Sequence, residues 1–160
     1  MKTTHDVTRT VDLLAEHPFL ADLPREWLDR LASHGHPSTR QPGRRLFHEG
    51  RAADRFWLVR SGRIALDITD AHRGDVVVDY IGAGSVLGWS WLFPPYRWHF
   101  GAVAVELTYT VELDAAGVRR LIADDAELGR ELTMRFMAVL ADRLQTTRQR
   151  IAELYAPGRT

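Results

Sequence analysis

The side chains best suited to holding a small molecule gather in one window, residues 84–100, which read GSVLGWSWLFPPYRWHF. This window holds three of the five Trp of the chain, together with one Arg and one His. Aromatic rings provide large apolar faces with polar edges, and a guanidinium provides several donors for an anion. A cluster of this kind either lines a ligand pocket or fills a hydrophobic core, and both alternatives remain open at this stage.

Glycine and proline flank and interrupt the aromatic window. Gly82, Gly84 and Gly88 allow close backbone approach and positive φ, and the pair Pro94-Pro95 ends regular structure. These residues favour a pocket, whereas large aromatic side chains on their own are more often simply buried. We therefore take the window as the candidate ligand site.

The sequence lacks the motifs of the common catalytic and metal sites. The chain has no cysteine, which excludes disulfides, thiolate catalysis and cysteine-ligated metals. The motifs of P-loop, nucleophile-elbow and dinucleotide sites are absent. The single H-x-H pair, His34-Gly-His36, is expected before the β-rich part rather than inside it, so no metal site is predicted. We predict no catalytic residues and expect a binding protein rather than an enzyme.

The charge balance argues against a broad nucleic-acid footprint. The chain carries 21 basic and 21 acidic side chains in 160 residues, whereas a nucleic-acid binder usually has a basic excess. The N-terminus lacks the apolar segment of a signal peptide, and no apolar run reaches the roughly 18 residues of a membrane span. We expect a cytoplasmic protein without a membrane contact.

The elements that position the window follow from hydrophobic periodicity. Helical spacing extends to about Ser33 with breaks at Pro18 and Pro24, and a loop is expected over residues 38–43. From residue 45 to 113 short β-like runs follow one another at spacings of about 8 to 12 residues, which predicts a sandwich or barrel. The window therefore lies within the β-rich part.

Two helices are expected after the β-rich part. Asp114 is placed to cap a short helix, and Asp124 or Asp125 a long one that reaches about Tyr155. The long helix carries two apolar stripes, of which the first should pack on the β-body. The first stripe is Leu128, Leu132, Phe136 and Val139, and the second is Met137, Leu140, Leu144, Thr147, Ile151 and Leu154. Most intervals of the second stripe alternate between three and four residues, as in a coiled-coil seam, which predicts a parallel homodimer. The alternative is an ordinary terminal helix that folds back on the barrel without a partner.

Three separated segments resemble the cyclic-nucleotide-binding domain family, and its Crp/Fnr group in particular. The first is Phe47-His-Glu-Gly50 followed by Asp54-Arg-Phe-Trp-Leu-Val-Arg-Ser-Gly62, and the second is Gly84-Ser-Val-Leu-Gly88, which stands where the family opens its phosphate-binding cassette. The third, Ala141 to Thr147, is similar to the family's dimer helix. The resemblance implies a mainly β protein with flanking helices, namely a double-stranded β-helix or jelly roll plus a long C-terminal dimerisation helix.

The candidate cassette departs from the family pattern at its charged positions. Trp89 occupies the place of the glutamate that receives the ribose hydroxyl, and Trp98 or Arg97 falls near the place of the phosphate-binding Arg. Thr147 matches a Thr that contacts the adenine in the family. The candidate ligand-binding residues are Gly88, Trp89, Ser90, Trp91, Leu92, Arg97, Trp98, His99 and Thr147. A cyclic nucleotide remains a candidate ligand, but the usual pose of cAMP is not expected.

These observations predict four segments: N-terminal helices over 1–36, a jelly roll over 37–114, C-terminal helices over 115–155 and a tail over 156–160. The resemblance implies a sensory or regulatory module with an altered aromatic pocket, acting on an unidentified regulated protein. Pro157 to Thr160 leave no room for a winged helix-turn-helix, so direct DNA binding is not expected. The alternatives are a ligand-free scaffold or protein-interaction module, and a haem sensor with His99 or Tyr96 as axial ligand.

Overall fold

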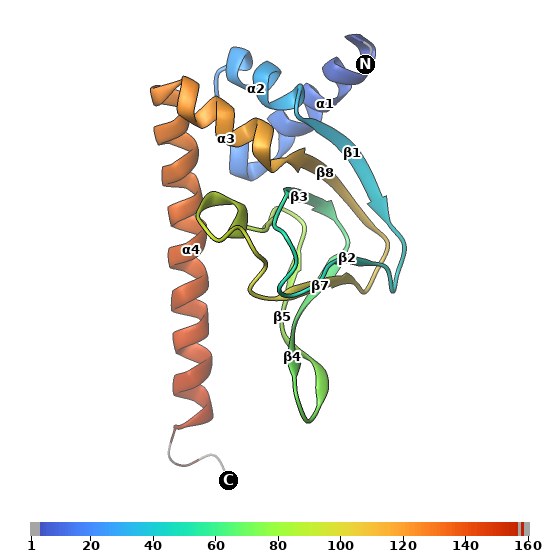
Figure 1. Cartoon of the computed structure of the whole chain (residues 1–160), viewed down its shortest axis with the longest axis vertical. Coiled ribbons are helices and arrows are strands. Elements are labelled where there is room, and N and C mark those ends of the chain that lie inside the picture. Colours follow the sequence, from blue (N-terminus) through green and yellow to red (C-terminus); the bar gives the residue numbers. More distant parts are fainter. Residues whose placement is uncertain (1–3, 157, 159–160) are drawn as a thin grey trace.

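Two antiparallel four-stranded sheets face each other and form the body of the molecule (Figure 1). The computed structural model describes residues 4–156 and 158. The first sheet has the order β1-β8-β3-β6 and comprises β1 (Gly35–Arg40), β8 (Thr108–Asp114), β3 (Arg55–Ser61) and β6 (Val86–Leu87). The second sheet has the order β2-β7-β4-β5 and comprises β2 (Arg45–Phe47), β7 (Gly101–Ala104), β4 (Arg63–Asp70) and β5 (Gly74–Gly82). The predicted fold class, a jelly roll with flanking helices, is confirmed.

Strand β3 is buried on both faces, because the second sheet covers one face and helices cover the other. Trp57 faces inward, where its ring stacks near Phe47 with centroids 5.4 Å apart. Phe56, the preceding residue, points the opposite way and meets Phe136 of the last helix with centroids 5.6 Å apart. Successive side chains of a strand alternate between faces, so one strand supplies both halves of the core.

Helices close the open face of the first sheet. These are α1 (Thr4–Glu16), the 3-10 turn η1 (Pro18–Leu20), α2 (Arg25–Ala32), α3 (Ala115–Asp124) and α4 (Ala126–Leu154). The predicted caps are present: the Asp114 carboxylate accepts from the Gly117 amide at 2.9 Å, and the Asp125 carboxylate accepts from the amides of Glu127 and Leu128. Each cap satisfies donors that the first turn of a helix leaves unpaired.

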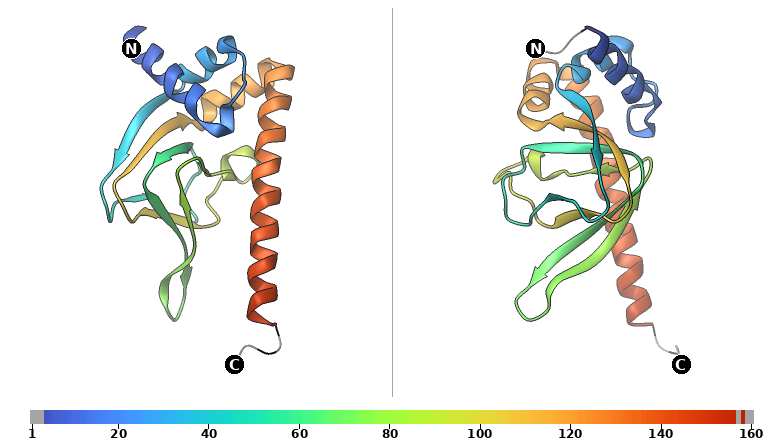
Figure 2. Two further views of the ribbon diagram at one scale, coloured as in Figure 1. Left: turned by 180° about the vertical axis from the view of Figure 1, so that it is seen from behind. Right: turned by 90° about the vertical axis from the view of Figure 1, so that its right-hand side faces the viewer.

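Helix α4 runs past the barrel along its whole side (Figure 2). The first apolar stripe is buried as expected, with Leu128, Leu132 and Phe136 each at most 2% exposed. The C-terminal half of α4 lies beside the β4–β5 hairpin, which it contacts through Arg143 and Arg150. No helix in the described part of the chain has both the length and the apolar character of a bilayer-spanning segment.

The expectation of a loop over residues 38–43 is wrong in its first half, because β1 continues to Arg40. The polar segment GHPSTR pairs with β8 along its full length, from Gly35 opposite Leu113 to Arg40 opposite Thr108. Pro37 is tolerated because β1 is an edge strand, where one side of the backbone needs no partner strand. Pairing with a neighbouring strand thus outweighs the weak strand preference of these residues.

Candidate functional site

The cassette segment begins with a tight backbone approach at Gly88. This residue has φ +100°, and a Cβ atom there would lie 2.8 Å from the Trp98 ring, so only glycine fits. The following 3-10 turn η2 (Ser90–Leu92) carries Ser90 and Trp91 inward. The glycine noted in the sequence thus serves to pack two parts of the same window against each other.

Two of the three Trp in the window belong to the hydrophobic core. Trp91 is fully buried, stacks on Phe56 with centroids 4.5 Å apart, and donates from Nε1 to the Gly88 carbonyl at 3.1 Å. Trp98 is 3% exposed and stacks on Phe47 with centroids 3.9 Å apart. The Trp91 indole fills space between the first sheet and the helices, whereas the Trp98 indole packs on Phe47 and forms part of the wall of a hollow of about 370 Å³.

Trp89 occupies a different environment, because it faces α4. Its side chain is half-buried, with the Phe100 ring at 5.1 Å and the guanidinium carbon of Arg143 5.6 Å from the ring centroid. An arginine over an indole face gains a cation–π contact. The position at which the family has a glutamate therefore carries an aromatic surface directed towards the last helix.

Arg97 and His99 of the window turn outward. Arg97 is exposed and its Nη1 donates to the Gly50 carbonyl at 3.0 Å. His99 is also exposed, and its Nδ1 lies 3.1 Å from the hydroxyl oxygen of the buried Ser90. In this geometry neither the Arg97 guanidinium nor the His99 ring lies in the barrel interior.

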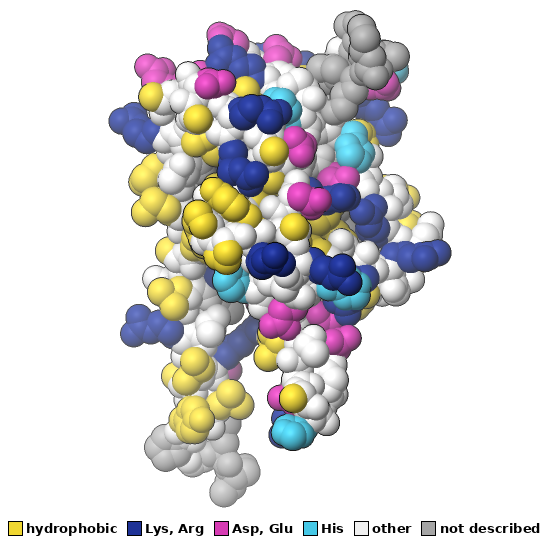
Figure 3. All heavy atoms as spheres, in the orientation of Figure 1, with side chains coloured by type: hydrophobic (Ala, Val, Ile, Leu, Met, Phe, Trp, Pro, Cys, Tyr) yellow, Lys and Arg dark blue, Asp and Glu magenta, His cyan; other side chains and the backbone are white. Residues whose placement is uncertain are grey.

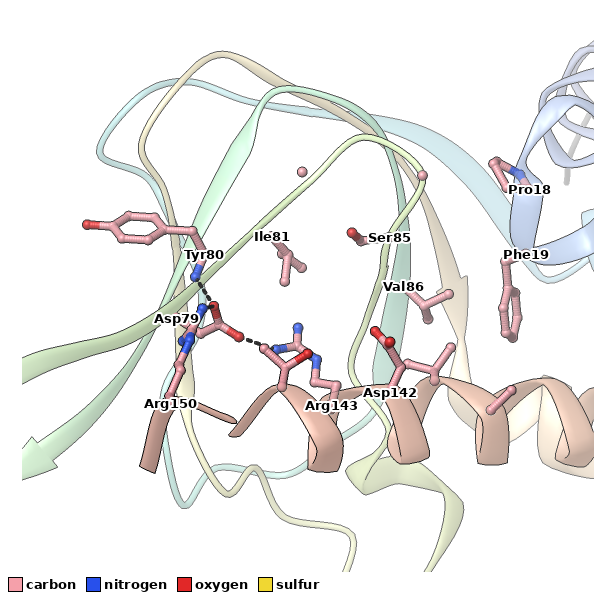
Figure 4. A pocket seen from close by; sticks show the side chains of 15 residues that line it. Pro18, Phe19, Asp79, Tyr80, Ile81, Ser85, Val86, Asp142, Arg143 and Arg150 are labelled. Atoms are coloured by element: carbon pink, nitrogen blue, oxygen red, sulfur yellow. Dashed lines mark hydrogen bonds and ion pairs between the residues drawn. The ribbon is translucent and has the colours of Figure 1, made fainter. Parts of the chain in front are cut away.

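A cavity of about 590 Å³ lies between β5 and α4 (Figure 4). Its lining comes from both elements, from the turn at η1 and from residues 84–86, which lead into β6. The lining residues are Pro18, Phe19, Asp79, Tyr80, Ile81, Gly82, Gly84, Ser85, Val86, Ala138, Val139, Asp142, Arg143, Thr146 and Arg150. None of the nine sequence-derived candidates belongs to this lining.

Asp79 links β5 to α4 at one end of this cavity. One carboxylate oxygen accepts from Nη1 of Arg143 at 2.8 Å, and the other accepts from Nη2 of Arg150 at 2.8 Å (Figure 4). Arg150 also donates from Nη1 to the Val78 carbonyl at 3.0 Å. Burial lowers the pKa of Arg143, and the Asp79 carboxylate opposes that shift. One carboxylate thus bridges two guanidinium groups that project from the same face of the helix, two turns apart.

The structure places Thr147 on the outer side of α4, where it is exposed. Its hydroxyl donates to the Arg143 carbonyl at 2.9 Å, within the helix itself. The neighbouring Thr146 lines the cavity instead. A signal for the lining residues was present in the sequence, since Val139, Arg143, Thr146 and Arg150 repeat at intervals of three or four on one helix face. Asp79 had no such signal, because an acidic residue in an exposed hairpin is unremarkable.

Two further charged clusters lie on the strands. Asp67, which is 5% exposed, accepts two hydrogen bonds from Arg45 at 3.0 and 2.7 Å, and this pair needs the space that Gly101 leaves open. Glu112 accepts from the Trp57 indole at 2.8 Å and lies 3.1 Å from Nε2 of His36. Among the described residues no group of three or more His, Asp or Glu could hold a metal ion. The Arg45–Asp67 pair joins β2 to β4 across β7, and the Glu112 cluster joins β8 to its neighbours β3 and β1.

Comparisons with known proteins agree on the fold. A family model described as the cyclic nucleotide-binding domain matches residues 39–125. A CRP-like cAMP-activated global transcriptional regulator of Mycobacterium tuberculosis is 27% identical over 120 residues, which are 73% of this chain and 52% of that protein. The chain therefore spans about half the length of the curated relatives that it matches.

Solved structures show the same architecture. A putative cyclic nucleotide-binding protein from Geobacter metallireducens superposes with a TM-score of 0.76 and 24% identity over 84% of this chain and 98% of that chain. The catabolite activator protein of Thermus thermophilus superposes with a TM-score of 0.67 and 24% identity over 86% of this chain and 62% of that chain. The matched residues run from the end of β1 to the N-cap of α4 and amount to more than half of the chain, so the protein belongs to the cyclic nucleotide-binding domain family, as a Crp/Fnr-like member.

Proposed function

We propose that this chain is a sensory or regulatory module whose ligand enters the cavity between β5 and α4, in a pocket altered by aromatic residues. The observation that carries the proposal is the pair of Trp89 and Asp79 on either side of Arg143. This arrangement connects the cassette, the barrel and the long helix at one point. A ligand in the cavity would contact the barrel and α4 directly and the residues just before the cassette through Gly84, Ser85 and Val86, and it could shift the position of α4.

The same geometry disfavours cAMP in the family's usual pose. The carboxylate for the ribose hydroxyl is replaced by Trp89, and Arg97 is turned to the Gly50 carbonyl. Each charge-assisted hydrogen bond contributes about 1.5 to 3 kcal/mol, so the loss of two costs about 3 to 6 kcal/mol, or roughly 10² to 10⁴ in affinity. The ligand is therefore a molecule that needs no cyclic-phosphate clamp.

The module acts as a homodimer in this proposal. The second stripe of α4 is exposed in the single chain: Met137 is 55%, Leu144 60%, Ile151 51% and Leu154 81% exposed. A second helix that covers apolar side chains at seam spacing removes them from water, which stabilises the dimer. Light scattering at micromolar concentration should give twice the mass of one chain, which is 18.2 kDa. A monomer mass would contradict the dimer.

A ligand-free scaffold is the second candidate, and the burial of Trp91 and Trp98 favours it. Both indoles belong to the core and are at most 3% exposed, so two of the three cassette Trp offer little surface to a ligand. A scaffold of this kind would regulate a partner through its surface alone. The same fold supports both functions.

Thermal-shift titration separates the two candidates. Cyclic AMP and cyclic GMP at about 10 µM should leave the melting temperature unchanged, whereas a ligand at 100 times its Kd adds about 2.7 kcal/mol, a shift of roughly 5 to 10 °C. Arg143→Met should abolish the shift given by a hit from a small-molecule library, and Arg148→Met, at an exposed position of the same helix, should preserve it. A micromolar response to cAMP would contradict the altered pocket, and silence across the library would favour the scaffold.

A further inference from the structure

A second groove, about 420 Å³ in volume, lies between η2, α3 and α4. Its walls are almost entirely apolar. The lining residues are Leu92, Phe93, Arg119, Ile122, Ala123, Thr133, Phe136, Met137 and Leu140. Two of them, Met137 and Leu140, also belong to the seam stripe of α4, so the groove is continuous with the surface on which a second helix would pack.

Exposed apolar side chains surround this groove beyond those of the stripe. Phe93, at the end of η2, is 44% exposed, and Met134 of α4 is 57% exposed. Figure 3 shows hydrophobic side chains along the outer length of α4 and a further group beside its upper half. Met134 does not belong to the stripe, so a contact confined to the seam leaves it unexplained.

We propose that a second copy of this chain fills the groove with the N-terminal half of its own α4, and that Met134 and Met137 of that copy pack on Phe93. The inference rests on the homodimer proposed above. The groove is lined by Phe136 of the buried face of α4 and by Met137 and Leu140 of the stripe, so it lies between the stripe and the protein's own barrel. In a parallel pair with a two-fold axis along the helices, the side of the second helix that faces this groove is its outer side. Met134 and Met137 lie on that outer side.

The chemistry of the contact suits these residue types. Methionine is flexible and fills irregular apolar space, and its sulfur makes a favourable contact with the edge of an aromatic ring. The stripe from residue 137 to 154 is only about 27 Å long at 1.5 Å per residue, so a contact confined to it is small. A stable interface buries about 800 Å² on each partner. The groove and Phe93 widen the contact at one end of a short seam. The cassette segment thereby becomes part of the interface between copies.

Cysteine cross-linking tests this arrangement directly, because the chain has no cysteine of its own. Leu144→Cys reports on the seam, since a parallel dimer brings the two copies of residue 144 together. A mixture of Phe93→Cys and Met134→Cys reports on the groove. Tyr109→Cys, an exposed position on β8, serves as the control. All variants are oxidised as full-length protein and also treated with a short bismaleimide, and cross-linked dimers are read on denaturing gels.

We expect cross-linked dimers from Leu144→Cys and from the Phe93→Cys and Met134→Cys mixture, and none from Tyr109→Cys. A cross-link at residue 144 without one in the mixture would overturn the groove contact and leave the homodimer standing. No cross-link at residue 144 would overturn the homodimer and the inference together. In a second measurement, Phe93→Ser should raise the dimer dissociation constant at least tenfold, with Tyr109→Ser as control. An unchanged constant would contradict the inference.

Discussion

The link between Asp79 and its two arginines gives a specific prediction, because Asp79 forms ion pairs with both Arg143 and Arg150. Asp79→Ala removes both ion pairs and leaves Arg143 without its carboxylate, although its side chain is only 19% exposed. Arg143→Met keeps an apolar stem over Trp89, and Asp79 retains Arg150. The acidic partner should therefore be the more costly one to lose.

The magnitude follows from partial burial. Exposed ion pairs contribute about 0.2 to 1 kcal/mol, and breaking a fully buried pair costs about 3 to 5 kcal/mol. With side chains 19% and 21% exposed, the values should fall between these limits. We expect Asp79→Ala to lower the free energy of unfolding by about 2 to 3 kcal/mol, Arg143→Met by about 1 kcal/mol, and a coupling of about 1 to 2 kcal/mol between them.

Urea unfolding of the two single variants and the double variant measures these quantities in a double-mutant cycle. Arg148→Met, at an exposed position of the same helix, is the control and should change the free energy of unfolding by less than about 0.5 kcal/mol. A greater loss from Arg143→Met than from Asp79→Ala would refute the reasoning. So would a coupling below about 0.3 kcal/mol, which is the scatter of independent sites.

Three further outcomes test the core, a buried histidine and a buried ion pair. Trp91→Ala should cost about 3 to 5 kcal/mol in urea unfolding, as expected for an indole that is fully buried against Phe56, and a loss below about 1 kcal/mol would place Trp91 outside the core. Burial lowers the pKa of His17 below 6.5, so the folded state binds fewer protons than the unfolded state and stability should fall as the pH drops below about 6.5. Urea midpoints at pH 7.5 and 5.5 should show this decrease for the natural protein and a smaller one for His17→Gln; equal decreases would exclude His17 as the source. Arg45→Met, which strands the carboxylate of Asp67, should destabilise the fold more than the double variant with Asp67→Leu does, and the reverse order in urea unfolding would contradict the buried pair.

The fold was largely predictable because its signals are local or periodic. Asp114 and Asp125 are capping residues that mark the starts of α3 and α4 in the sequence. The spacing of Leu128, Leu132 and Phe136 identifies the buried face of α4. Strand β1 escaped prediction because its polar residues form a strand only through pairing with β8, a contact far away in the sequence.

The site was less predictable, because the direction of a side chain depends on registers that a sequence does not display. The aromatic window can be located from the sequence, but whether Trp89 or Trp91 lies beside Arg143 of α4 depends on the turn at η2. The choice between Thr146 and Thr147 depends on a rotation of about 100° along a helix. Asp79 lies 64 residues from Arg143, so their pairing could not be read from local pattern.

The length of α4 gives the molecule a lever. At its start, Asp125 caps the helix and receives an ion pair from Arg30 at 2.6 Å, which holds that end against α2. The helix then continues for 29 residues, about 43 Å at 1.5 Å per residue. A tilt of only about 5° around the capped end moves Leu154 by roughly 4 Å, by the same rise per residue. Arg143 lies about 26 Å along the helix from the capped end, so a shift of about 1 Å there becomes a shift of about 1.6 Å at Leu154.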